Sequence, residues 1–174
     1  MLLLVSLGGG ATSAAASTSP AEYAKAYCRS VQTFRLQIAK DEAQFHTATA
    51  SDGSGLVTAK QQIVSFLTAQ SKAARAAASA MGNVEAPAAK KGDQLAQGVV
   101  DALNAFRDEL GVLADNAARL STTDAKAFAK AAAGLDAGGF RRSLRRLDRK
   151  LTALGTNRPI GKALAAQKAC AALF

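Results

Sequence analysis

Residues 87–120 read PAAKKGDQLAQGVVDALNAFRDELGVLADNAARL, and this stretch decides the fold class. Its apolar residues recur three, four or seven positions apart, which is the spacing along one face of an α-helix. They are Leu95, Val99, Phe106, Leu110, Leu113, Ala117 and Leu120. A stripe of this length is typical of the seam along which the helices of a bundle pack. Gly98 and Gly111 each cost about 1 kcal/mol relative to alanine inside a helix, so they predict a close helix neighbour or a slight kink.

Further helices are expected on both sides of this one. Ser19, Pro20 and Glu22 have the pattern of a capping box with proline at the first helical position, which predicts that a first helix begins here. Its apolar stripe comprises Tyr27, Val31, Phe34, Ile38 and Phe45, and a loop over residues 47–55 should follow it. A second helix is expected over about residues 56–81. Beyond residue 120 we expect three shorter helices, over about residues 125–134, 139–154 and 159–174, separated by glycines and Pro159.

The composition supports helices throughout. Hydrophobic residues make up 49% of the 174 positions, but aromatic residues only 5%, and tryptophan is absent. Alanine, the best helix former, dominates the apolar total and favours closely packed helices over sheets. The sequence therefore predicts an all-α fold, an up-and-down bundle of four main helices plus one or two short helices. Residues 19–174 form its single domain.

The only two cysteines are Cys28 and Cys170, which flank almost the whole of this domain. Ahead of them, residues 1–18 contain a short apolar core and a run of small residues, as a signal peptide does, although no basic residue precedes Lys25. An exported chain with an even number of cysteines is expected to form a disulfide, here between the first and last helices. We expect a secreted, extracytoplasmic protein with no transmembrane segment in its mature chain. The alternatives are a disordered tail in place of the leader, and two separate buried thiols.

The net charge of +9 is concentrated at the end of the chain. Residues 139–174 contain nine basic side chains and one acid, Asp148, whereas residues 1–138 are nearly neutral. Within the expected helix over residues 139–154, the apolar seam is Phe140, Leu144, Leu147, Leu151 and Leu154. The arginines that flank it are Arg141, Arg142, Arg145, Arg146 and Arg149. We expect these arginines to bind an anionic partner, the simpler alternative being a solvated outer face of the bundle.

Catalytic and cofactor-binding residues are hard to find in this sequence. None of the common nucleophile, zinc-protease, phosphate-loop or dinucleotide motifs occurs, so a non-catalytic protein without a cofactor or metal is expected. The one histidine, His46, is more simply explained by a helix C-terminus than by catalysis. Tyr27, Asp41 and His46 are candidates for a pocket between helices. Asp41 and Gln70 occupy matching seam positions of the first two helices, where they either fix helix register or line a small polar pocket.

Two classes of function are therefore expected. The first is a non-catalytic protein of the cell envelope whose basic face binds lipid head groups, a wall polymer or an acidic protein. Dedicated nucleic-acid binding is not expected, because no aromatic residues lie among the arginines to stack on bases. The second is a carrier of haem or another small molecule. An alanine-rich, exported chain with one disulfide is similar to many small secreted proteins of high-GC bacteria.

Overall fold

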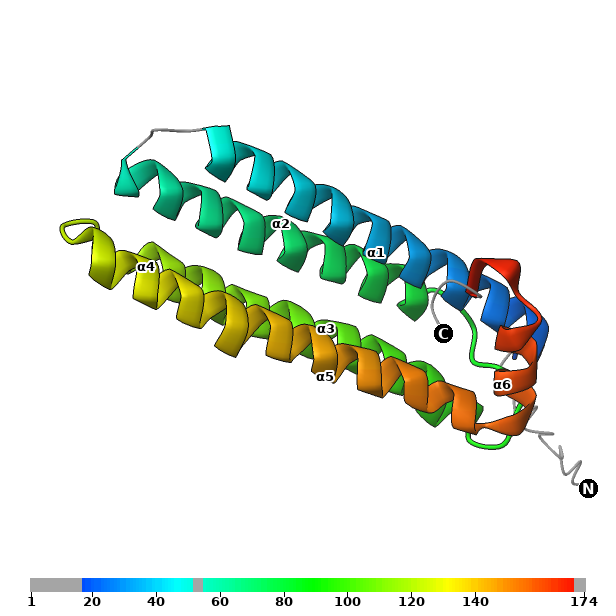
Figure 1. Ribbon diagram of the computed structural model, residues 1–174. Coiled ribbons are helices and arrows are strands. Elements are labelled where there is room, and N and C mark those ends of the chain that lie inside the picture. Colours follow the sequence, from blue (N-terminus) through cyan, green and yellow to red (C-terminus); the bar gives the residue numbers. More distant parts are fainter. Residues whose placement is uncertain (1–16, 52–54, 171–174) are drawn as a thin grey trace, which may run out of the picture.

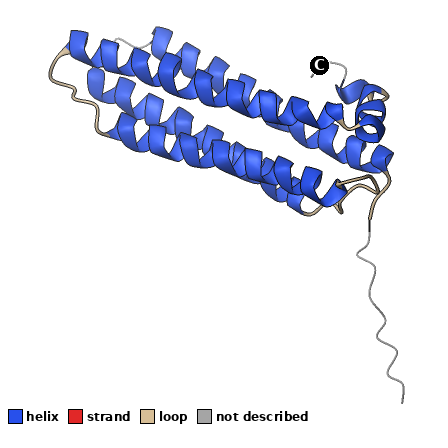
Figure 2. Ribbon diagram, turned by 90° about the horizontal axis from the view of Figure 1, so that it is seen from below, coloured by secondary structure: helices blue, strands red, loops and turns tan. Residues whose placement is uncertain are grey.

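The structure, a computed structural model, describes residues 17–51 and 55–170, apart from the side chains of residues 45–51 and 136–138. Its main helices are α1 (Pro20–Ser51), α2 (Leu56–Gly82), α3 (Gly92–Ala118), α4 (Ala125–Gly134) and α5 (Arg141–Thr152). The chain runs up α1, down α2, up α3 and down through α4 and α5 (Figure 1). The short helix α6 (Arg158–Ala165) lies across one end of this four-rod bundle (Figures 1 and 2). The described residues form no β-strand, so the predicted all-α bundle is confirmed.

The predicted capping box starts α1. The backbone N–H of Glu22 donates to Ser19 Oγ at 3.2 Å, and the Glu22 carboxylate accepts from the Ser19 backbone N–H at 3.2 Å. These bonds satisfy donors that the first turn of a helix leaves free. Hydrogen bonds from Ser19 also hold the pKa of Glu22 below its usual range.

The third helix, expected over about residues 87–120, instead begins at Gly92 and ends at Ala118, so the expected start at about Pro87 was wrong. Residues 86–88 instead pair with the chain ahead of α1. The Thr18 N–H donates to the Ala86 carbonyl at 3.0 Å, and the Ala88 N–H donates to the Thr18 carbonyl at 2.7 Å. Glycine is required at position 92, because a side chain there would overlap the carbonyl oxygen of Pro87.

The two glycines inside α3 do not mark a close helix neighbour. A Cβ atom added at Gly98 or Gly111 would meet no atom within 4 Å. The predicted close approach is therefore wrong at both positions, and the structure gives no packing reason for either glycine.

Helices α4 and α5 form one continuous rod, contrary to the predicted break between residues 134 and 139. A π-helical turn, η1 (Leu135–Phe140), joins them. Phe140 at its end is buried, with its ring centroid 5.3 Å from that of Phe66 and 6.4 Å from that of Phe106. A π-helical turn inserts an extra residue into a helix, and here the helix that follows places its apolar face against the core.

The core lies along the bundle axis, and the disulfide lies at the end covered by α6. The largest fully buried side chains include Tyr23, Tyr27, Phe106, Met81, Leu103 and Leu110. Cys28 on α1 is bonded to Cys170 in the final turn, η3 (Lys168–Cys170), with 5.2 Å between their Cα atoms. The predicted disulfide between the first and last helical segments is confirmed. The last helix is shorter than expected, because α6 ends at Ala165 and residues 171–174 lie outside the described residues.

Candidate functional site

Helix α5 has one face in the core and a basic face in solvent. The predicted seam packs inward: Phe140, Leu147, Leu151 and Leu154 are buried, and Leu144 is half-buried. The basic side chains on the other faces of α5 are all exposed: Arg141, Arg142, Arg145, Arg146, Arg149 and Lys150. Because the leucines fix the rotation of the helix about its axis, they also fix the outward direction of the arginines.

The five arginines differ in their surroundings. Arg146 forms an ion pair with Glu109 of the neighbouring α3, so part of its charge is already balanced. Arg142, Arg145 and Arg149 form no ion pair in the part of the chain that the structure describes. These three, which we call the arginine ridge, are three and four positions apart and therefore share one helix face.

The acidic side chains of α3 limit this basic surface on one side. They are Asp93, Asp101, Asp108, Glu109 and Asp115, against a single basic residue, Arg107. One of them, Glu109, pairs with Arg146 and so balances part of the basic charge on the side of α5 that faces α3.

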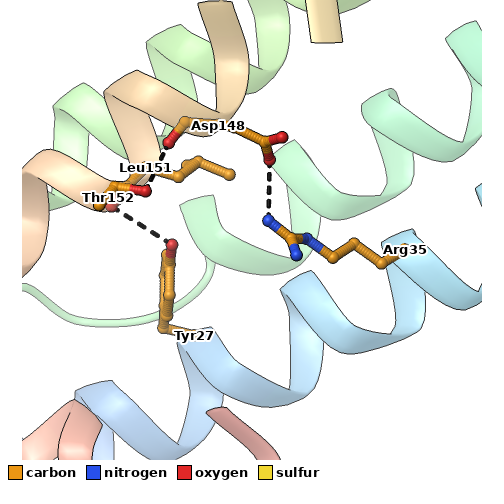
Figure 3. Close-up of polar contacts among 5 residues, drawn as sticks. All are labelled: Tyr27, Arg35, Asp148, Leu151 and Thr152. Carbon is orange, nitrogen blue, oxygen red and sulfur yellow. Dashed lines mark hydrogen bonds and ion pairs between the residues drawn. The ribbon is translucent and has the colours of Figure 1, made fainter. Parts of the chain in front are cut away.

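Polar contacts join α1 to α5 (Figure 3). Arg35 pairs with Asp148 at 2.8 Å, and the hydroxyl of the buried Tyr27 donates to the Leu151 carbonyl at 3.5 Å. Burial raises the pKa of Tyr27. Tyr27 is thus a core residue at a helix contact.

Asp41 and Gln70, each predicted to fix helix register or to line a small polar pocket, are hydrogen-bonded to one another. Gln70 Nε2 donates to Asp41 Oδ2 at 2.9 Å, and Gln37 Nε2 donates to Asp41 Oδ1 at 2.7 Å. Gln70 is fully buried and Asp41 is 9% exposed. The Gln70 Oε1 atom has no hydrogen-bond partner in the described chain. The cluster therefore joins α1 to α2 through buried polar side chains and fixes the register of one helix against the other.

A groove of about 690 Å³ runs along the outer junction of α1 and α2, and Asp41 lies in its wall. Its lining on α1 is Arg29, Ser30, Thr33, Phe34, Gln37 and Asp41. Its lining on α2 is Lys72 and the alanines at positions 69, 73, 76, 77 and 80. Alanine side chains end at Cβ, so neighbouring helices that meet through them leave space between their outer edges.

Of the three residues predicted to line a pocket, only Asp41 lines this groove. Tyr27 lies in the core, and the side chain of His46 lies outside the described residues. The groove was not predicted from the sequence, although the many alanines in the second half of α2 indicate a helix with small outward-facing side chains.

The described part of the chain shows neither a metal-binding cluster nor a membrane-spanning helix. Among the side chains that the structure describes, which do not include His46, no three His, Cys, Asp or Glu residues are grouped so that they could hold a metal ion. No helix in the same part of the chain has the length and apolar character needed to cross a membrane.

Comparison with known proteins gives no relative. No protein-family model, no curated protein and no solved structure matches this chain.

Proposed function

We propose that the chain is an exported, non-catalytic protein of a bacterial cell envelope that presents the basic face of α5 to an anionic partner. The partner is a surface of anionic lipid head groups, a wall polymer or an acidic protein. The leader pattern and the disulfide support export, since disulfides persist in oxidising compartments.

The observation that carries this proposal is the arginine ridge. Arg142, Arg145 and Arg149 share one exposed helix face, have no ion pair in the described chain, and lie opposite a buried leucine seam. Guanidinium groups bind phosphate and carboxylate through two parallel hydrogen bonds, and a rigid helix holds all three in a fixed row.

Binding to anionic vesicles or a purified wall polyanion tests the proposal. Replacing Arg142, Arg145 and Arg149 with glutamine should weaken cosedimentation on the order of tenfold, because three phosphate contacts are lost. The wild type should also lose affinity steeply as salt rises, and the triple variant less steeply.

The matched control removes the same charge elsewhere. Lys25, Arg75 and Arg119 are exposed and lie on or at the ends of other helices, so replacing all three with glutamine lowers the net charge equally. If both triple variants bind alike, the ridge is only a solvated surface and the proposal fails.

A second candidate function is favoured by the groove between α1 and α2. A volume of about 690 Å³ lies within the range of small-molecule sites, and its wall combines apolar side chains with a few polar groups. This supports a small-molecule carrier. It does not support a haem carrier, because the lining contains none of the His, Cys, Met or Tyr side chains that hold haem iron.

A further inference from the structure

The groove is long and narrow. Its lining on α1 extends from Arg29 to Asp41, which is about 18 Å along a helix that rises 1.5 Å per residue. Packed helices lie only about 8–10 Å apart, so a groove along their junction is one side chain wide. Such a shape accommodates a single unbranched chain better than a broad, planar molecule.

The polar groups divide the groove into two ends and a middle. Because α1 and α2 run antiparallel, Arg29 and Ala80 lie at one end and Asp41 and Ala69 at the other. The buried ring of Phe34 and the alanines of α2 form the middle, which is apolar.

The two cations in the lining differ in what lies beside them. Arg29 is exposed, forms no ion pair in the described chain, and has the hydroxyl-bearing residues Ser30 and Thr33 next to it in the lining. Lys72 belongs to the end that also contains the Asp41 carboxylate, which offsets its charge. An anion is therefore stabilised more at the Arg29 end.

We propose that the groove binds an alkyl carboxylate. Its head lies at Arg29, and its apolar chain runs over Phe34 towards the cluster of Gln37 and Asp41. The inference rests on the carrier function, the second candidate above, and is independent of the arginine ridge. The polar cluster ends the apolar part about 12 Å from Arg29 at the helical rise per residue, so the site has a preferred chain length.

Isothermal titration of the full chain with octanoate, decanoate and dodecanoate tests the proposal. Each added methylene should tighten binding by up to about fourfold until the chain reaches the polar cluster, with no further gain beyond it. Dodecanol and dodecylammonium serve as charge controls, and both should bind more weakly than dodecanoate.

Two variants test the placement of the ligand. Ala76→Leu fills the groove from an exposed position and should weaken dodecanoate binding on the order of tenfold, since the displaced chain loses buried methylenes. Arg29→Gln should weaken dodecanoate about fivefold, as expected for one exposed ion pair, and leave dodecanol unchanged. The matched controls are Ala39→Leu on α1 and Arg75→Gln on α2, both exposed and outside the groove lining.

Each contrary result has a distinct meaning. If dodecanol and dodecylammonium bind as tightly as dodecanoate and Arg29→Gln changes nothing, the carrier function stands and the ligand class is overturned. If no amphiphile binds, the carrier function itself fails. If Lys72→Gln weakens binding more than Arg29→Gln, the head lies at the other end and the proposal is overturned. If Ala76→Leu changes only the sedimentation coefficient, the groove is a contact between two copies of the chain, which also overturns it.

Discussion

Helix α1 is held in different ways on its two sides. Towards α5, α6 and η3, which we call the closed edge, it is held by the disulfide, the Tyr27–Leu151 hydrogen bond and the Arg35–Asp148 pair. Towards α2, which we call the open edge, outward alanines leave a groove, and one polar cluster around Asp41 crosses the junction. The comparison shows that small side chains let α1 and α2 approach closely while leaving space along their outer edges, whereas α1 meets α5 through long side chains.

The largest effect is expected from breaking the closed edge. Replacing Cys28 and Cys170 together with alanine should lower the free energy of unfolding by about 4–5 kcal/mol, because the bond closes a loop of more than 140 residues in the unfolded chain. Urea denaturation measures the loss, and far-UV circular dichroism should show nearly unchanged helix content at room temperature. A loss below about 1 kcal/mol would mean that the closed edge does not depend on its covalent bond.

A smaller effect is expected from alkaline pH, again at the closed edge. Burial raises the pKa of Tyr23 from 10.0 to about 12 and raises that of Tyr27 as well. The unfolded chain loses these protons near pH 10 while the folded chain keeps them, so the free energy of unfolding should fall as pH rises from 10 to about 12. The fall for Tyr23 is up to about 1.4 kcal/mol per pH unit.

Urea denaturation across this pH range measures the effect, and tyrosinate absorbance reports ionisation, because the chain has only two tyrosines. The variant Tyr23→Phe should show a shallower decline. At neutral pH it should lose little stability, because the Tyr23 hydroxyl is buried without a hydrogen-bond partner in the described chain. Ionisation of both tyrosines near pH 10 would contradict their burial.

The smallest of the three effects is expected at the open edge. Asp41→Ala should lower the free energy of unfolding by about 1–3 kcal/mol, because it leaves the buried Gln70 amide without an acceptor. Replacing Asp41 and Gln70 together with leucine should restore most of this loss, since no unsatisfied polar group then remains.

Gln32→Ala, at an exposed position of α1, is the control, and its effect should stay within about 0.5 kcal/mol. If the double variant is less stable than Asp41→Ala alone, the cluster contributes more to the free energy of unfolding than the hydrogen bond that the buried Gln70 amide requires. The open edge then depends on this cluster as the closed edge depends on its disulfide.

The sequence was sufficient for the features that depend on a few neighbouring residues or on periodicity. The capping box at Ser19, the leucine seam of residues 140–154 and the pairing of the two cysteines are all confirmed. The seam positions of Asp41 and Gln70 also predicted that both side chains face the neighbouring helix, but the hydrogen bond between them was not predicted.

The sequence was insufficient where another part of the chain decides the outcome. Pro87 does not begin α3, because the residues on either side of it, Ala86 and Ala88, form backbone hydrogen bonds with Thr18. The glycines before Phe140 do not end a helix, because burying that ring against Phe66 and Phe106 favours a continuous rod with a π-helical turn. The groove depends on which helices are neighbours and on how small their outer side chains are. The apolar periodicity of a helix predicts only its inner face, so it does not predict a groove formed by outward-facing side chains.

The position of the disulfide constrains the order of events during synthesis. Cys28 is made 142 residues before Cys170, an interval of about 7–28 s at 5–20 residues per second. The chain contains no other cysteine, so no intramolecular disulfide, correct or incorrect, can form in this interval. All four rods of the bundle have been synthesised before the second thiol exists. All of the sequence that packs in the bundle is therefore available to fold before the bond forms, and oxidation joins two ends that packing brings to 5.2 Å between their Cα atoms.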